Sequence, residues 1–145
     1  MIRPATPSDI PMLLDMGERF HAESNFGAHA PYNAASWEST LNNFLSSEIW
    51  RVLVWDDGGV RGFIAGSIMP LYFNHSVTVS HELLWWVMPD HRRGAGQRLL
   101  DAFHADADLG FQTVSETTPR CEAVKRKLRM DGWQHIESGF MKELG

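Results

Sequence analysis

The stretch that decides the fold reads SHELLWWVMPDHRRGAGQ and covers residues 80–97. Its first half, Ser80–Met88, is apolar at both alternating sets of positions, which is typical of a central strand that is covered on both faces. A polar turn follows and leads through Gly94-Ala95-Gly96 into a helix with an apolar face. This order predicts a strand–turn–helix unit at the parallel part of a mixed sheet.

The turn at residues 91–97 has the residue types that bind a phosphate. Gly94 and Gly96 lack Cβ atoms, so a ligand can approach the backbone, and the first N–H groups of a helix have no helical partner. The helix dipole favours an anion there, and Arg92 and Arg93 add cationic donors. The glycines do not have the spacing of a dinucleotide fingerprint or of a P-loop. The alternative is a purely structural turn whose arginines face water.

Turn residues and hydrophobic periodicity predict the remaining elements. We expect a short strand at 2–5, helices at 6–21 and 35–45, hairpin strands at 49–55 and 60–69, a polar stretch at 70–79, a strand at 111–115, a last helix from Thr118-Pro119, and one or two strands within 133–144. The helix after the glycine turn is expected to reach Ala107 and to end at Gly110. This order predicts an α+β fold in a single domain, residues 1–145.

Composition excludes several classes of protein. The chain has 145 residues, 43% of them hydrophobic, and a net charge of −5, which disfavours a nucleic-acid-binding protein. The single Cys121 excludes an intramolecular disulfide framework and a Cys-rich zinc site, and no His-Glu-x-x-His motif occurs, so we expect no metal. Without an apolar run of about 20 residues or a signal-peptide pattern, we expect no membrane contact and a cytoplasmic protein.

The segment His91–Gly96 resembles the acetyl-CoA-binding motif of the GCN5-related N-acetyltransferase (GNAT) family, Gln/Arg-x-x-Gly-x-Gly/Ala, with His91 at the usual Gln/Arg position. Ile2–Ile10 is similar to the family's opening strand and helix start, and Asp131-Gly132-Trp133 is similar to its Gly-aromatic pair. The resemblance covers essentially the whole chain. It implies a GNAT-like fold: a mixed central sheet of about six to seven strands, with about four helices on both faces.

The resemblance also implies a co-substrate, acetyl-CoA, and no metal. Backbone groups of Val87 and Met88 would hold the pantetheine arm. The pyrophosphate would lie at the turn. The cofactor-binding residues that the resemblance implies are Val87, Met88, Arg92, Arg93, Gly94, Ala95, Gly96 and Gln97.

For catalysis, the resemblance implies Glu82 as the base that takes the amine proton. His81 is the competing base, because the pKa of a histidine is naturally near neutrality. Leu128 stands where many members of the family carry a tyrosine acid, which leaves the general acid open.

Two functions are therefore expected. The first is an N-acetyltransferase that moves an acetyl group from acetyl-CoA directly to a primary amine of a small molecule or a protein. The alternative is a non-catalytic acyl-CoA-binding or protein-interaction module on the same fold. An exposed edge strand formed by the terminal segment would allow a homodimer.

Overall fold

The computed structural model describes residues 1–105, 108–115 and 121–145. One sheet has the strand order β1-β2-β3-β4-β5, with antiparallel neighbours except for the parallel pair β4 and β5. The strands are β1 (Ile2–Pro4), β2 (Trp50–Asp56), β3 (Val60–Leu71), β4 (Asn74–Val87) and β5 (Leu109–Thr113). The helices are α1 (Ile10–Glu23), α2 (Ala34–Ser46), α3 (Arg92–Phe103) and α4 (Cys121–Met130), and short 3-10 turns cover Pro7–Asp9 and Pro89–His91.

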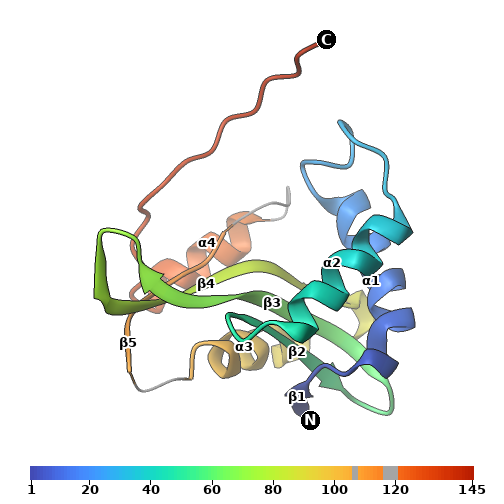
Figure 1. Ribbon diagram of the computed structural model, residues 1–145, viewed down its shortest axis with the longest axis horizontal. Coiled ribbons are helices and arrows are strands. Elements are labelled where there is room, and N and C mark those ends of the chain that lie inside the picture. The colour runs from blue at the N-terminus through green and yellow to red at the C-terminus, as the bar shows by residue number, and fades with distance from the viewer. Residues whose placement is uncertain (106–107, 116–120) are drawn as a thin grey trace.

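Helices cover both faces of the sheet (Figure 1), so the predicted α+β class is confirmed. α1 and α2 pack on one face through a cluster that includes Leu13, Leu41 and Phe63. α3 packs on the other face, where Leu99 and Phe103 meet Ile64, and α4 and the residues after it add to this second cluster. The parallel β4–α3–β5 unit is the one that the glycine turn predicts.

The predicted end of one strand at Met69 and start of the next at Ser80 are wrong. β3 continues to Leu71 and β4 starts at Asn74, so the two form one long hairpin with its turn at Tyr72 and Phe73. The polar side chains here are compatible with a strand because the neighbouring strand supplies the backbone partners. Local hydropathy alone could not indicate that pairing.

Two further sequence predictions differ from the structure. α3 ends at Phe103 instead of Ala107, and Gly110 lies inside β5 instead of closing the helix. The start of the last helix at Thr118-Pro119 lies outside the described residues. Within 133–144 the structure has no strand, so the sheet has five strands instead of six to seven.

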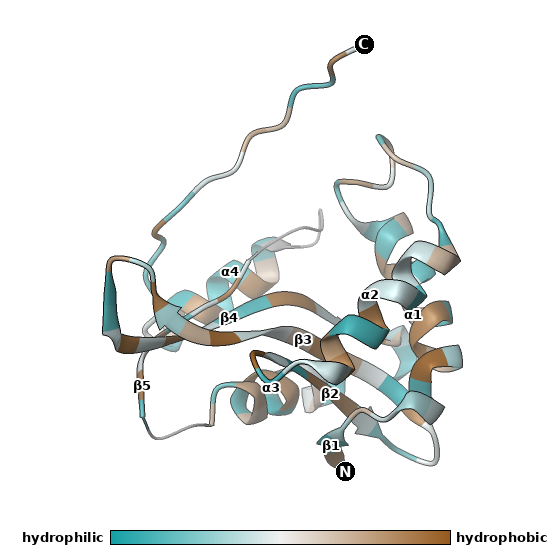
Figure 2. Cartoon of the chain, viewed as in Figure 1, coloured by the Kyte–Doolittle hydropathy of each residue, from teal (hydrophilic) through white to brown (hydrophobic). Residues whose placement is uncertain are grey.

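The C-terminal residues instead run away from the sheet as an extended segment (Figure 1). A strand needs a partner for its backbone groups, and no described element of the chain provides one here. Hydrophobic positions recur along this segment among hydrophilic ones (Figure 2).

Gly66 controls how closely β3 and β4 can approach. It lies at the irregularity in their register, between Ala65 and Gly66, where Leu83 of β4 has no opposite residue. A Cβ atom on Gly66 would lie 1.9 Å from the carbonyl oxygen of His81 and 2.7 Å from Cζ of Phe103. Only a residue without a side chain fits at this bulge.

We therefore expect Gly66→Ala to lower the free energy of unfolding by at least about 2 kcal/mol, because a backbone oxygen would have to shift. Gly139→Ala is the control, since a Cβ there meets nothing within 4 Å. It should change stability by less than about 0.5 kcal/mol. Urea unfolding of both variants measures this, and equal stabilities would contradict the packing described here.

Candidate active site

The parallel pairing of β4 and β5 stops where β5 ends, whereas β4 continues to Val87. Their parallel pairing runs from Thr78 with Leu109 to His81 with Thr113. From Glu82 to Val87, β4 pairs with β3 on one side and with no described strand on the other. This leaves an open edge of β4 beyond the end of β5, here named the V, whose inner end, the apex, lies at Glu82.

The register shows which backbone groups of β4 face this V. The N–H of Met88 donates to the carbonyl of Arg61 at 2.8 Å, and the carbonyl of Met88 accepts from the N–H of His91 at 2.9 Å. Backbone groups alternate in direction along an antiparallel ladder, so those of Val87 and Trp85 point away from β3 and into the V. The carbonyl of Val87 already accepts a hydrogen bond from Arg92, and both backbone groups of Met88 have partners elsewhere.

The glycine turn lies at the open end of the V. The first residues of α3 are irregular: Arg93 has ψ 85° and Gly94 has φ +79°, so regular helix begins at Ala95. Gly94 is exposed, and a Cβ there would meet nothing within 4 Å, which leaves room for a ligand above it. Its positive φ also favours glycine.

The other residues of the turn have structural contacts. A Cβ on Gly96 would lie 3.3 Å from the Trp85 ring, so this glycine lets β4 pack against α3. Ala95 is buried in the core under α3, and the Gln97 amide donates to Asp101 at 2.7 Å. What these residues can offer a phosphate is therefore their backbone N–H groups at the start of the helix.

The guanidinium of Arg92 is held by hydrogen bonds to other parts of the protein, so it is not a free cation at the turn. Its Nε donates to the carbonyl of Val87 at 2.8 Å, and its Nη2 lies 3.4 Å from Oε2 of Glu23 at the end of α1. The guanidinium also lies 5.6 Å from the ring centre of Trp86, whose Nε1 donates to the same carboxylate. Arg92 thus joins the turn, β4 and α1, while the neighbouring Arg93 is exposed.

Glu82 is a buried carboxyl group at the apex of the V. It is 4% exposed, and its Oε2 accepts from the backbone N–H of Ser115 at 2.9 Å, just beyond the end of β5. Burial raises the pKa of Glu82 to about 8, and the Ser115 N–H only partly opposes this effect. A carboxyl group with a pKa near the working pH has the property that a general base requires.

A second buried pair lies two residues earlier on β4. The hydroxyl of Ser80 is 2.7 Å from Nδ1 of His104, the residue that follows α3. Burial lowers the pKa of His104 to about 4, so the ring is neutral at neutral pH. It therefore adds no positive charge that would lower the pKa of Glu82.

His81, the competing base, points to the opposite face of β4 from Glu82, since neighbours on a strand alternate. Its Nδ1 lies 2.6 Å from the hydroxyl of Thr113. Next to the apex, Leu83 is 46% exposed, so β4 is open to solvent there instead of covered on both faces. Leu83 is also the residue of β4 that has no opposite residue in β3.

The sequence reasoning missed Ser115 and Glu23. Each reaches its partner across a long sequence separation: 33 residues from Ser115 to Glu82 and 69 from Glu23 to Arg92. The Ser115 contact uses a backbone group, which no residue type can indicate. No local motif would have found either residue.

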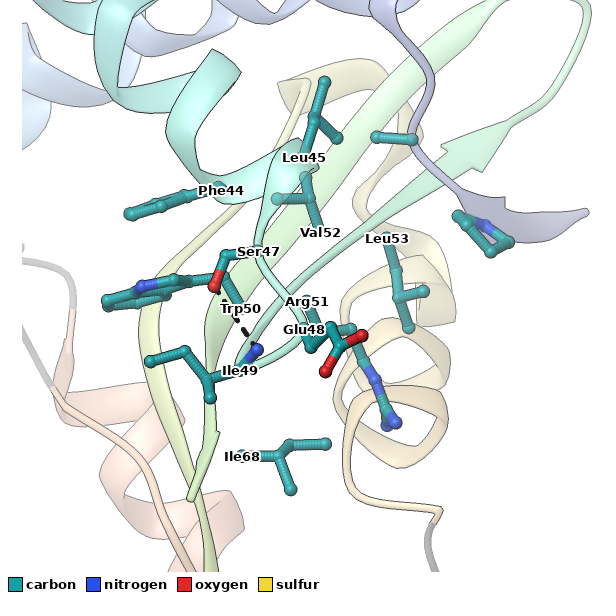
Figure 3. Close-up of a pocket in the computed structure, with 12 residues that line it drawn as sticks. Phe44, Leu45, Ser47, Glu48, Ile49, Trp50, Arg51, Val52, Leu53 and Ile68 are labelled. Carbon is teal, nitrogen blue, oxygen red and sulfur yellow. Dashed lines mark hydrogen bonds between the residues drawn. The ribbon is translucent and has the colours of Figure 1, made fainter.

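A hollow of about 360 Å³ lies elsewhere, between the end of α2 and the start of β2 (Figure 3). Phe44 and Trp50 stack at its wall with ring centres 4.1 Å apart. None of the site residues predicted from the sequence lines it. Among the described side chains, no three His, Cys, Asp or Glu residues gather as metal ligands. No described helix is long and apolar enough to cross a bilayer.

No family model matches the sequence, and no curated protein matches it significantly. Solved structures do match. A transcriptional regulator from Bacillus halodurans C-125 is similar with TM-score 0.80 and 14% identity, over 99% of each chain. AAC(6')-Iy, in complex with the bisubstrate analogue CoA-S-monomethyl-acetylneamine, has TM-score 0.74 and 16% identity, over 100% of this chain and 97% of that one.

A ribosomal-protein-alanine N-acetyltransferase from Brucella melitensis biovar Abortus 2308 is similar with TM-score 0.70 and 16% identity, over 99% of each chain. At such identities the likeness shows the fold. The chain has the GNAT-like fold that the sequence motifs imply, and the match extends over the whole of it.

The raised pKa of Glu82 has a consequence for stability. Because the folded state holds this proton up to about pH 8 and the unfolded state loses it near pH 4.5, the free energy of unfolding should fall as the pH rises between these values. Glu82→Gln has no carboxyl group at this position and so lacks this pH dependence. The free energy of unfolding of the variant, relative to that of the parent, should therefore rise from pH 5 to pH 8 and stay constant above pH 8. Urea unfolding of both proteins at pH 5, 6.5, 8 and 9 measures it. A constant difference would mean that the Glu82 pKa is not raised.

Proposed function

We propose that this protein is an N-acetyltransferase of the GCN5-related type, which transfers an acetyl group from acetyl-CoA directly to a primary amine. The observation that carries the proposal is the buried carboxyl group of Glu82 at the apex of the V between β4 and β5, with the glycine turn at its open end. The two features lie on one strand–turn–helix unit, so one extended ligand can contact both.

The V and the turn match the parts of acetyl-CoA. The pyrophosphate would bind the backbone N–H groups at residues 93–97, where the helix dipole favours an anion. The pantetheine arm, which carries amide groups, would add to the free edge of β4 at the N–H of Val87 and the backbone groups of Trp85, as a strand would. The thioester would then lie near Glu82. The complex of AAC(6')-Iy with a CoA-containing bisubstrate analogue supports a CoA-type co-substrate on this fold.

The proposed reaction begins with the acceptor, which is an ammonium ion at neutral pH with a pKa of about 10. Glu82 in its ionised form takes one proton from it, directly or through water. The amine nitrogen then attacks the thioester carbon, and a backbone N–H of β4 in the V donates to the oxyanion. When the intermediate collapses, the C–S bond breaks and CoA leaves as its thiolate. The nitrogen gives its second proton to water or to the thiolate, which leaves a neutral amide.

A strong general acid is not essential to this sequence of steps. A thiolate whose conjugate acid has a pKa of about 8.5 is a fair leaving group, so Leu128 at the usual tyrosine position is compatible with turnover. Of the two candidate bases, the geometry favours Glu82. His81 faces the other side of β4 and has Thr113 as its partner.

The alternative is a non-catalytic acyl-CoA-binding module. Leu128 at the tyrosine position and the low exposure of Glu82 favour it, because an acceptor must still reach a carboxyl group that is 4% exposed. The two functions differ in one measurable property: both bind acetyl-CoA, and only the enzyme releases CoA when an amine is added.

We expect Glu82→Gln to lower kcat by about 10²- to 10⁴-fold with acetyl-CoA binding retained, because the amine proton loses its acceptor. In the parent, kcat should rise with pH through the Glu82 pKa of about 8. CoA release with a panel of primary amines measures both, and Glu38→Gln on the exposed face of α2 is the matched control. Undiminished turnover in Glu82→Gln would refute Glu82 as the base. Absence of turnover in the parent with every amine would favour the binding module.

A further inference from the structure

We propose that Glu23 is a positioning residue for acetyl-CoA. From the end of α1 it holds Arg92, and through Arg92 it keeps the glycine turn in the form that receives the pyrophosphate. This inference rests on the proposed function, because it assigns a role toward the same co-substrate. It follows from the unfavourable place of Glu23 on its helix, the contacts of Arg92 and the irregular backbone of the turn.

Glu23 lies where a helix disfavours a negative charge. It is the last residue of α1, and the helix dipole already places partial negative charge at that end. Two donors from other elements offset this cost. Oε2 of Glu23 accepts from Nε1 of Trp86 in β4 at 3.2 Å and lies 3.4 Å from Nη2 of Arg92 in the turn. These two contacts join α1 to β4 and to the turn.

The side chain of Arg92 closes the turn that separates β4 from α3. Val87 is the last residue of β4 and Arg92 is the first of α3, and Nε of Arg92 donates to the carbonyl of Val87 at 2.8 Å. An arginine side chain has many rotamers, so partners at its end are needed to keep it in one of them. Among the described acidic side chains, only that of Glu23 lies within 4.0 Å of the guanidinium.

The backbone that follows Arg92 has little else to fix it. Arg93 has ψ 85° and Gly94 has φ +79°, so both residues lie outside helical geometry. Both are also exposed, and a Cβ on Gly94 would meet nothing within 4 Å, so packing does not hold them. Their anchors are Arg92 on one side and the buried Ala95 on the other. The form of the turn therefore depends on how firmly Arg92 is held.

The charge of Glu23 makes this role distinguishable from a direct electrostatic effect. A carboxylate near an anion repels it, so electrostatics alone predicts that removal of Glu23 tightens the binding of acetyl-CoA. A positioning role predicts the reverse, because a turn that is fixed before binding loses less conformational entropy when the ligand arrives. The sign of the change in affinity separates the two.

Calorimetric titration of the full chain with acetyl-CoA tests this inference. We expect Glu23→Ala to weaken binding by about 10-fold, as for the loss of one contact to a charged group. Glu23→Gln keeps an oxygen that can accept from both donors and should stay within about 3-fold of the parent. Circular dichroism shows whether each variant is folded. Unchanged or tighter binding by Glu23→Ala would overturn the inference.

Glu18→Ala is the matched control. It removes an equal charge from an exposed position of the same helix and should bind acetyl-CoA as the parent does. If Glu18→Ala weakens binding as much as Glu23→Ala, the effect belongs to the charge of α1 and not to the contact with Arg92, which would also overturn the inference.

A double-mutant cycle shows whether Glu23 acts through Arg92. In an Arg92→Met background, Glu23→Ala should change the affinity for acetyl-CoA by less than about 2-fold. Arg92→Lys keeps the charge without the planar fork of donors and should bind at least as weakly as Glu23→Ala. Equal weakening by Glu23→Ala in both backgrounds would mean that Glu23 only supports α1, and would overturn the inference.

The parent protein separates a failure of this inference from a failure of the proposed function. A parent that binds no acetyl-CoA would contradict both. A parent that binds acetyl-CoA, with variants that show none of these effects, would contradict the role of Glu23 alone.

Discussion

The end of the pairing between β4 and β5, at His81 and Thr113, is the constraint on which the rest of the site depends. It leaves the backbone groups of Val87 and Trp85 without a neighbouring strand, and it brings the N–H of Ser115 to the carboxyl group of Glu82. The bulge at Gly66 and the packing of Trp85 on Gly96 fix β4 on its other side. A sheet that paired fully at this point would have neither a ligand edge nor a buried acid.

The burial of Glu82 affects both the stability of the folded protein and the chemistry of the carboxyl group. An ionised carboxylate in this environment is unfavourable unless it is paired, and the described structure gives it one hydrogen bond, from the N–H of Ser115. The result is a raised pKa, which weakens the folded state at high pH and makes the group a base near neutrality. Perturbed carboxyl groups of this kind are concentrated at functional sites.

The sequence was sufficient for the parts of the fold that rest on local patterns. The apolar run before Gly94 indicated a central strand, and the glycine turn indicated the parallel unit that the structure has. The sequence was insufficient where the structure of a segment depends on the strand with which it pairs. The stretch 70–79 became strand because β3 and β4 pair, whereas residues 133–144 have a strand pattern but no described partner in their own chain. The contact between Arg92 and Glu23 likewise depends on packing between elements that are distant in the sequence.

The most direct test of the central claim, that acetyl-CoA occupies the V and the glycine turn, is a calorimetric titration of the protein with acetyl-CoA. We predict micromolar affinity, about −8 kcal/mol, for the parent. Gly94→Glu should lose binding because it puts a carboxylate where the pyrophosphate would lie. Gly94→Ala, which brings the same backbone strain without the charge, should bind more weakly than the parent but measurably. No binding by the parent, or equal binding by Gly94→Glu, would mean that the glycines only shape a turn.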